Sequence, residues 1–278
     1  MGTDVKVWDA ATGRVSAELN VDTRIVFCLA WHPDGRRLAC GCSDGRQSIV
    51  KVWDVCNRRE AFALPAGQEY FTVAFSGDGR YLVTGRLNGA VQVWDAGTGQ
   101  EVVTLGMHNQ EIRVVVLSPD PDGRHLASAS TGGVVKLWDA TRLNEKQEAR
   151  LTLRARIPRT SWNLAFSPDG QRLATGGEKN TVKIWDVQTG RELLPPLEGH
   201  SGEVYTVAFS PDAEGRWIAS AGEDSTVKVW DSHTGKLLRS FRGHTGLVSS
   251  VAFSPDGLRL VSGSRDGTIK VWDLTPLR

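Results

Sequence analysis

Two sets of side chains in this 278-residue chain are of the types that hydrolyse acyl bonds. In the order His, Ser, Asp, the sets are His200, Ser220, Asp224 and His244, Ser262, Asp266. A serine hydroxyl, an imidazole base and an orienting carboxylate make up a hydrolase triad. In both sets the serine lies four residues before the aspartate, and a tryptophan follows the aspartate by six. A constellation that recurs with the same offsets indicates a repeated structural unit, so the elements that carry it need to be identified.

The tryptophans reveal that unit. Seven of the ten tryptophans directly precede an aspartate, and they are Trp8, Trp53, Trp94, Trp138, Trp185, Trp230 and Trp272. Their spacings run from 41 to 47 residues. A period in this range is typical of stacked supersecondary units.

Each period contains only strand and turn signals. In residues 243–272, the runs VSSVAF, LRLVSGS and TIKVW are short and rich in β-branched residues. SPDG separates the first two runs, and Asp266-Gly267 is a hairpin signal between the second and third. A fourth run follows a Thr-Gly turn, as in HTGKLLRSF at 233–241. Four antiparallel strands per period are typical of one propeller blade, which predicts an all-β fold.

With these motifs the chain resembles the WD-repeat (WD40) β-propeller family, and in particular tandem WD-repeat proteins of bacterial type. The resemblance covers nearly all of residues 1–278, taken as one domain, and depends on seven Trp-Asp dipeptides in KVWD-like strands. It implies six near-complete blades plus an N-terminal half blade over residues 3–20, with a seven-bladed ring in a longer parent. In the alternative, strand 14–20 joins the last blade and closes a six-bladed ring.

The family pattern gives the two triad-like sets another role. It implies buried hydrogen-bonded tetrads that tie a loop to its blade, namely His200, Ser220, Asp224, Trp230 and His244, Ser262, Asp266, Trp272. The other blades depart from this pattern, with Gly132 at one aspartate position and Cys40 at one hydroxyl position. We therefore expect no catalytic residues and no enzymatic activity.

The resemblance also points to a binding surface, because family partners usually contact the face whose loops enter the first strands. Early first-strand positions and the residues before the hairpin aspartate are expected to line this rim. These residues are Phe27, Phe71, Arg113, Trp162, Tyr205, Ser249, Leu87, Glu178, Glu223 and Arg265. Aromatic and arginine side chains are enriched at binding hot spots. If most of the four rings were buried between blades, this surface would be wrong.

Composition narrows the range of partners. Lys plus Arg is 33 and Asp plus Glu is 32, giving a net charge of +1. A balanced chain is a poor candidate for a nucleic-acid or anionic-membrane binder.

The chain has four cysteines, Cys28, Cys40, Cys42 and Cys56. Their spacing is not that of a metal site, so we expect no metal and no cofactor. No second cysteine cluster indicates a disulfide framework, which favours a reducing compartment, the cytoplasm.

The sequence therefore predicts a non-catalytic scaffold that binds a protein or peptide on a rigid propeller face. One alternative is a regulatory or sensing module of a larger multidomain protein such as a kinase. The other is a propeller enzyme, which would need convergent carboxylates or histidines at the channel mouth. An unpaired strand edge next to the half blade could also mediate self-association.

Overall fold

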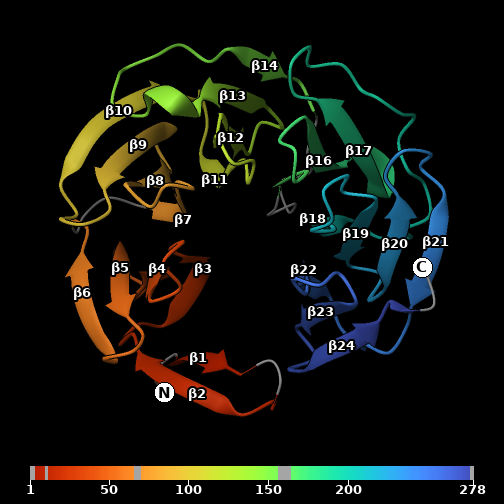
Figure 1. The fold of residues 1–278 in the computed structure, drawn as a ribbon, viewed down its shortest axis with the longest axis horizontal. Helices are drawn as coiled ribbons and strands as arrows, with labels where there is room; N and C mark the ends of the chain where they lie inside the picture. The colour runs from red at the N-terminus through yellow and green to blue at the C-terminus, as the bar shows by residue number, and fades with distance from the viewer. Residues whose placement is uncertain (1–3, 10–11, 66–69, 156–163, 276–278) are drawn as a thin grey trace.

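The structure is a computed structural model that describes residues 4–9, 12–65, 70–155 and 164–275, the side chain of Phe71 excepted. Within these ranges the chain forms strands β1 to β24 and two short 3-10 turns, η1 (Ala140–Arg142) and η2 (Glu178–Asn180). The strands make antiparallel sheets that stand around a central axis, as Figure 1 shows. The predicted all-β propeller is confirmed.

Six of the sheets are blades, numbered here in chain order, with the first strand nearest the axis (Figure 1). Blade 1 is β3 (Ile25–Trp31), β4 (Arg37–Ser43), β5 (Ser48–Asp54) and β6 (Arg59–Ala63), and blade 2 is β7 (Tyr70–Phe75), β8 (Tyr81–Arg86), β9 (Ala90–Asp95) and β10 (Glu101–Met107). Blade 3 is β11 (Ile112–Leu117), β12 (His125–Ser130), β13 (Val135–Asp139) and β14 (Leu151–Leu153), and blade 4 is β15 (Leu164–Phe166), β16 (Arg172–Gly177) and β17 (Thr181–Asp186). Blade 5 is β18 (Val204–Phe209), β19 (Trp217–Gly222), β20 (Val227–Asp231) and β21 (Leu237–Phe241), and blade 6 is β22 (Val248–Phe253), β23 (Arg259–Ser264) and β24 (Ile269–Asp273).

The seventh position in the ring holds a half blade of two strands, β1 (Asp4–Trp8) and β2 (Val15–Asn20), between blades 6 and 1 (Figure 1). Trp8 places β1 at the third-strand position, so β2 is the fourth strand. Six near-complete blades plus a half blade are therefore confirmed. The alternative in which residues 14–20 complete the last blade is wrong, because β2 pairs with β1 through Val5 and Leu19.

Blade 4 departs from the predicted four strands. Its fourth-strand position contributes only two isolated bridges, Val182 with Leu197 and Trp185 with Glu192. Pro195 and Pro196 lie between these bridges. Because proline has no backbone N–H, it cannot continue the hydrogen-bonded ladder.

The aspartate of each Trp-Asp dipeptide anchors the turn that follows the third strand. The Oδ1 atom of Asp95 accepts hydrogen bonds from the backbone N–H of Thr98 at 2.8 Å and from its hydroxyl at 2.9 Å. The carboxylates of the other six dipeptides accept equivalent backbone hydrogen bonds two or three residues on. These bonds form Asx turns, which explains why a short polar residue follows the tryptophan.

The core lies between neighbouring blades, because each blade has two apolar faces. One face carries small residues of the second strand and β-branched residues of the third, such as Ala39, Val50 and Val52 in blade 1. The opposite face of the next blade carries bulkier first-strand residues, such as Val73 and Phe75 in blade 2, and the two faces pack together. Each blade is thus stabilised by its neighbours.

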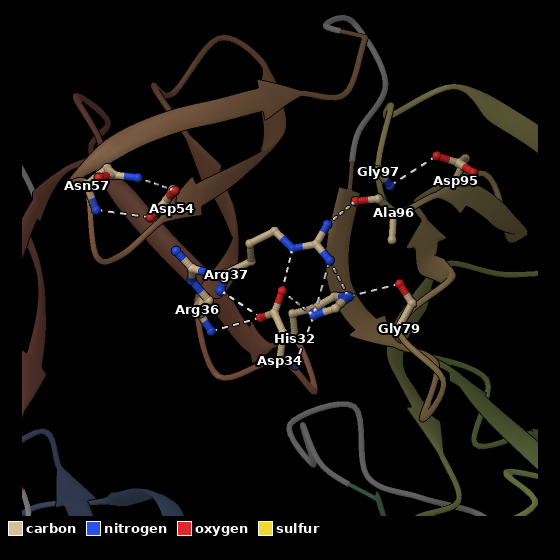
Figure 2. A network of polar contacts seen from close by, with 10 residues as sticks. All are labelled: His32, Asp34, Arg36, Arg37, Asp54, Asn57, Gly79, Asp95, Ala96 and Gly97. Atoms are coloured by element: carbon tan, nitrogen blue, oxygen red, sulfur yellow. Dashed lines mark hydrogen bonds and ion pairs between the residues drawn. The ribbon is translucent and has the colours of Figure 1, made fainter.

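Polar contacts also join blades 1 and 2 at the turn between the first and second strands, as Figure 2 shows. The Arg37 guanidinium donates to the carbonyl of Ala96 at 2.8 Å, and the Nε2 atom of His32 lies 2.9 Å from the carbonyl of Gly79. The Asp34 carboxylate accepts a hydrogen bond from Arg37 Nε at 2.9 Å, which holds the guanidinium in place. These contacts fix the orientation of blade 1 relative to blade 2 at the end opposite the predicted rim.

Candidate functional site

The first triad-like set forms one hydrogen-bonded network in blade 5. Ser220 lies on β19, Trp230 on β20, and His200 in the loop before β18. The His200 Nε2 atom and the Trp230 Nε1–H both lie 2.7 Å from the Ser220 hydroxyl oxygen. The His200 Nδ1 atom lies 2.8 Å from the Asp224 carboxylate. The structure therefore brings all four residues together.

Blade 6 repeats this arrangement with nearly the same distances. The Ser262 hydroxyl lies 2.8 Å from His244 Nε2 and 2.9 Å from Trp272 Nε1. The His244 Nδ1 atom lies 2.9 Å from the Asp266 carboxylate, which also accepts from the Thr245 backbone N–H at 3.0 Å. The second set is thus also assembled as a tetrad.

Burial decides what the tetrads can do chemically. Ser220 is 0% exposed and Ser262 is 1% exposed, so neither hydroxyl can reach a substrate. Burial disfavours ionisation of the Asp224 carboxyl, but hydrogen bonds from His200 and Thr226 outweigh it and hold its pKa well below the usual range. The ionised carboxylate orients His200, His200 contacts the Ser220 hydroxyl, and that hydroxyl accepts the hydrogen bond from Trp230. A fully paired buried network of this kind stiffens a fold.

A G-x-S-x-G sequence at residues 41–45, GCSDG, also resembles a hydrolase motif. That motif requires a strand, a sharp turn and a helix to expose its serine. Here Ser43 ends β4 in a β-hairpin, is buried, and donates its hydroxyl to the carbonyl of Gln47 at 2.9 Å. The surrounding hairpin therefore lacks the geometry of a nucleophile elbow.

Three other blades keep part of the tetrad. In blade 3 the Ser128 hydroxyl lies 2.7 Å from His108 Nε2 and 2.8 Å from Trp138 Nε1, with Gly132 at the aspartate position. In blades 2 and 4 a threonine hydroxyl accepts from the tryptophan, Thr84 from Trp94 at 2.9 Å and Thr175 from Trp185 at 3.1 Å. The bond between tryptophan and hydroxyl is therefore the most widespread part of the network.

Blade 1 lacks this bond. Cys40 occupies the hydroxyl position, and the buried Trp53 Nε1–H has no hydrogen-bond partner. Burial raises the pKa of the Cys40 thiol to about 12, so the thiol stays protonated and unreactive. A buried donor without an acceptor costs about 1–3 kcal/mol.

We expect Cys40→Ser to raise the free energy of unfolding by about 1 kcal/mol, because its hydroxyl can accept from Trp53 as the serines do in blades 3, 5 and 6. Urea unfolding followed by circular dichroism measures the change. Cys42→Ser is the matched control, since Cys42 is equally buried but its thiol already contacts the Ile49 carbonyl. If both substitutions destabilise the protein equally, Trp53 does not need an acceptor.

The predicted rim residues fall into three groups. Phe27, Tyr205, Ser249 and Arg265 line one central cavity of about 820 Å³. Glu178 and Glu223 are exposed, and Leu87 and Arg113 are half-buried. Trp162 and the side chain of Phe71 lie outside the described residues. The cavity thus joins first-strand residues of blades 1, 5 and 6.

Tyr205 differs from the expectation of an exposed ring, since only 8% of it is accessible. It nevertheless is one of the residues that line the central cavity. The cavity is also lined by Ala30, Ala74 and Val116, which the sequence prediction missed. These three share one repeat position directly before the end of the first strand, and that common offset was a usable signal.

Other kinds of site were sought in the described part of the chain. No group of three or more His, Cys, Asp or Glu residues there could hold a metal ion. The four cysteines are free thiols. Within the same ranges, no helix is sufficiently long and apolar to span a bilayer.

Comparison with known proteins finds relatives that match only part of this chain. The chain is 33% identical over 120 residues to "WD repeat-containing protein SL1-17" of Schistosoma mansoni, covering 43% of this chain and 39% of that protein. It is 30% identical over 111 residues to "Cell division cycle 20.1, cofactor of APC complex" of Arabidopsis thaliana, covering 39% of this chain and 24% of that protein. The matches thus span well under half the length of these curated relatives.

A family model covers most of the chain. The model described as "WD domain, G-beta repeat" matches residues 13–54, 68–95, 99–139, 158–186, 191–231 and 235–273. Each matched segment ends at or next to the aspartate of a Trp-Asp dipeptide, where the third strand ends in the structure. The repeats, the blades and this match agree, and the chain belongs to the WD-repeat family.

Proposed function

We propose that this protein is a non-catalytic scaffold that binds a peptide or protein segment across the central opening of its ring. The observation that supports it best is the cavity of about 820 Å³ lined by residues from separate blades, among them Phe27, Tyr205, Ser249 and Arg265. A ligand that enters this opening would contact several blades at once. Because the blades are rigid, little of the contact energy is lost in ordering the scaffold.

The chemistry of the rim indicates what kind of segment it would take. Phe27, Tyr205 and Arg265 line the same cavity and supply aromatic surface and a positive charge, and the exposed Glu223 adds a negative charge. Aromatic rings and arginine are the side chains that most often dominate binding energy. A short segment with an apolar centre and flanking charged residues is the ligand that this set would favour.

The test is to select peptides from a displayed random library against the purified chain and to measure their affinity for variants. We expect Phe27→Ala together with Arg265→Glu to weaken binding by about tenfold or more, as expected when anchor residues are removed. Arg216→Glu is the control, because Arg216 is exposed in the turn between β18 and β19, at the opposite end of its blade. Selected peptides that bind both variants as tightly as the parent chain would show that the rim is not the site.

A second candidate is a regulatory module within a larger protein. The lengths of the relatives favour it, because the matched region is 24% of the Arabidopsis protein named as a cofactor of a complex. In either role the free thiols of the chain fit a reducing compartment such as the cytoplasm.

A further inference from the structure

Arginine side chains join neighbouring blades at the end of the ring opposite the predicted rim. At the junction of blades 1 and 2, the Arg37 guanidinium donates to the carbonyl of Ala96, which directly follows a Trp-Asp dipeptide (Figure 2). The Asp34 carboxylate, on the same blade as Arg37, accepts from its Nε atom. This junction thus combines a carboxylate on one blade, an acceptor on the next blade and a guanidinium between them.

Two further junctions place an arginine next to the same position. Between blades 3 and 4, Arg150 donates to the carbonyl of Val187 at 2.6 Å, and Val187 directly follows the dipeptide of blade 4. Between blades 4 and 5, Arg172 donates to the hydroxyl of Ser232 at 2.8 Å, and Ser232 follows the dipeptide of blade 5. The space next to this position therefore holds a guanidinium in three junctions.

The junction of blades 2 and 3 lacks the arginine but keeps the rest of the arrangement. Tyr81 occupies the position of Arg37, the first residue of the second strand, and Asp78 occupies the position of Asp34. A cavity of about 330 Å³ opens here, with Asp78 and Tyr81 on blade 2 and Ala140, the residue after the dipeptide, on blade 3. This volume is at the lower end of the range for small-ligand pockets, roughly 300–1,000 Å³. Within the described ranges no arginine donates to Ala140.

The charges around this blade 2–3 cavity favour a cation. Burial opposes ionisation of the Asp78 carboxyl, but hydrogen bonds from the Ser76 hydroxyl at 2.6 Å and the Arg80 backbone N–H at 3.0 Å lower its pKa. Asp78 is therefore ionised at neutral pH, and in the described part of the chain no basic side chain forms an ion pair with it. Asp122, the other carboxylate of the lining, is paired with Arg124 at 2.7 Å. One carboxylate of the cavity thus remains available to a ligand.

Arg80 also lines the blade 2–3 cavity, but its charge does not exclude a second cation. Its guanidinium carbon lies 5.8 Å from the centre of the Tyr81 ring, and its charge helps to lower the pKa of Asp95 on the same blade. In blade 1 the equivalent Arg36 directly precedes Arg37, whose guanidinium nevertheless occupies the junction (Figure 2). Two neighbouring arginine side chains are therefore compatible with this geometry.

We propose that the blade 2–3 cavity binds the arginine side chain of a partner polypeptide, which supplies the guanidinium that this junction lacks. The guanidinium would donate to the Asp78 carboxylate and reach Ala140 on the next blade, the arrangement that Figure 2 shows within the chain itself. Arginine suits the cavity better than lysine, because its planar fork can donate to two acceptors at once. The cavity lies at the opposite end of the ring from the proposed rim, so this inference does not depend on the proposed function.

The probe is the tripeptide acetyl-Gly-Arg-Gly-amide, titrated at low salt into the isotope-labelled chain and followed by the NMR shifts of the Arg80, Tyr81 and Asn144 backbone amides. We expect saturable shifts with a dissociation constant on the order of 1 mM, as suits a single charged anchor in a partly exposed site. The same peptide with citrulline keeps the shape of arginine but not its charge, so it should bind about tenfold more weakly or worse. The lysine peptide should also bind more weakly.

Variants of the chain locate the site. Asp78→Asn should weaken binding of the arginine peptide about tenfold or more, and should leave its turn intact because an amide oxygen can still accept from Ser76 and Arg80. Asp44→Asn is the matched control, since Asp44 also accepts two backbone N–H bonds, but in the hairpin between β4 and β5 at the other end of a blade. Tyr81→Arg should abolish peptide binding, because it supplies the guanidinium from within the chain. Circular dichroism and thermal unfolding check that each variant is folded.

Four results would overturn the proposal. The first is no saturable shift at a peptide concentration twenty times the expected constant. The second is equal binding of the arginine and citrulline peptides. The third is equal binding of the arginine peptide by Asp78→Asn and Asp44→Asn. The fourth is tighter binding of acetyl-Gly-Glu-Gly-amide at the same backbone amides, because Arg80 would then hold an anion in this cavity.

Discussion

Trp230→Ala is expected to lower the free energy of unfolding by about 3–5 kcal/mol, whereas Trp8→Ala should lower it by less than about 0.5 kcal/mol. Both residues belong to a Trp-Asp dipeptide, but their surroundings differ. Trp230 is 1% exposed, packs among residues of blades 4 and 5, and donates to Ser220. Trp8 is half exposed, so alanine removes little buried surface there.

Urea unfolding of the two variants, followed by far-ultraviolet circular dichroism, measures this difference. Trp230→Phe separates packing from hydrogen bonding, because phenylalanine keeps most of the ring but has no N–H. We expect Trp230→Phe to cost about 1–3 kcal/mol, part of it from a hydroxyl that loses its donor. If Trp8→Ala and Trp230→Ala destabilise the protein equally, the tryptophans do not act through the blade interfaces.

Most of the fold can be predicted from the sequence because one unit recurs. The Trp-Asp dipeptides mark the third strands, and the Pro-Asp-Gly and Asp-Gly turns mark strand ends earlier in the repeat. What the repeat cannot predict is burial that depends on a neighbour. Trp8 lies in the same motif as Trp230, yet its exposure follows from the second strand that β1 lacks among the described residues.

The candidate site shows the same limit. The spacing of His200, Ser220 and Asp224 matches a tetrad, and the structure brings these residues into contact. The burial of Tyr205 could not be predicted, because it depends on how closely the blades stand around the central cavity that this residue lines, and sequence alone does not give that spacing. The Trp53 N–H lacks a hydrogen-bond partner because Cys40 has a sulfur where serine has a hydroxyl oxygen. The cysteine is visible in the sequence, but only the pairing of β4 with β5 shows which donor it leaves without an acceptor.

Acidification from pH 7 to pH 4 is expected to remove about 3 kcal/mol of stability through His108 alone. Burial, with a smaller effect of Lys136, lowers the pKa of His108 from 6.5 to about 4. Between these values the unfolded chain binds a proton at this residue and the folded chain does not. The stability that depends on a neutral His108 is therefore fully present above pH 6.5 and is lost progressively as the pH falls toward 4.

The glycine at the aspartate position of blade 3 leaves the effect of burial on His108 without an opposing carboxylate. His200 and His244 each contact a carboxylate, whereas His108 has Gly132 at the equivalent place. The carboxyls of Asp224 and Asp266 have pKa values below their usual range, so their contributions are lost only as the pH falls below about 4. The loss between pH 6.5 and pH 4 thus belongs mainly to His108, and His125, whose pKa burial also lowers, adds to it with the same sign.

The unfolding free energy measured by urea titration at pH 7, 6, 5 and 4 tests this explanation. His108→Gln should flatten the dependence without removing it, because His125 still titrates in this range. Gly132→Asp should also flatten it, since a carboxylate next to the imidazole favours the charged form, and the three atoms nearest to the new Cβ all belong to the flexible Gln110 side chain. If His108→Gln shows the same slope as the parent chain, the acid sensitivity arises elsewhere. If Gly132→Asp steepens it, the missing carboxylate is not the reason for the low pKa of His108.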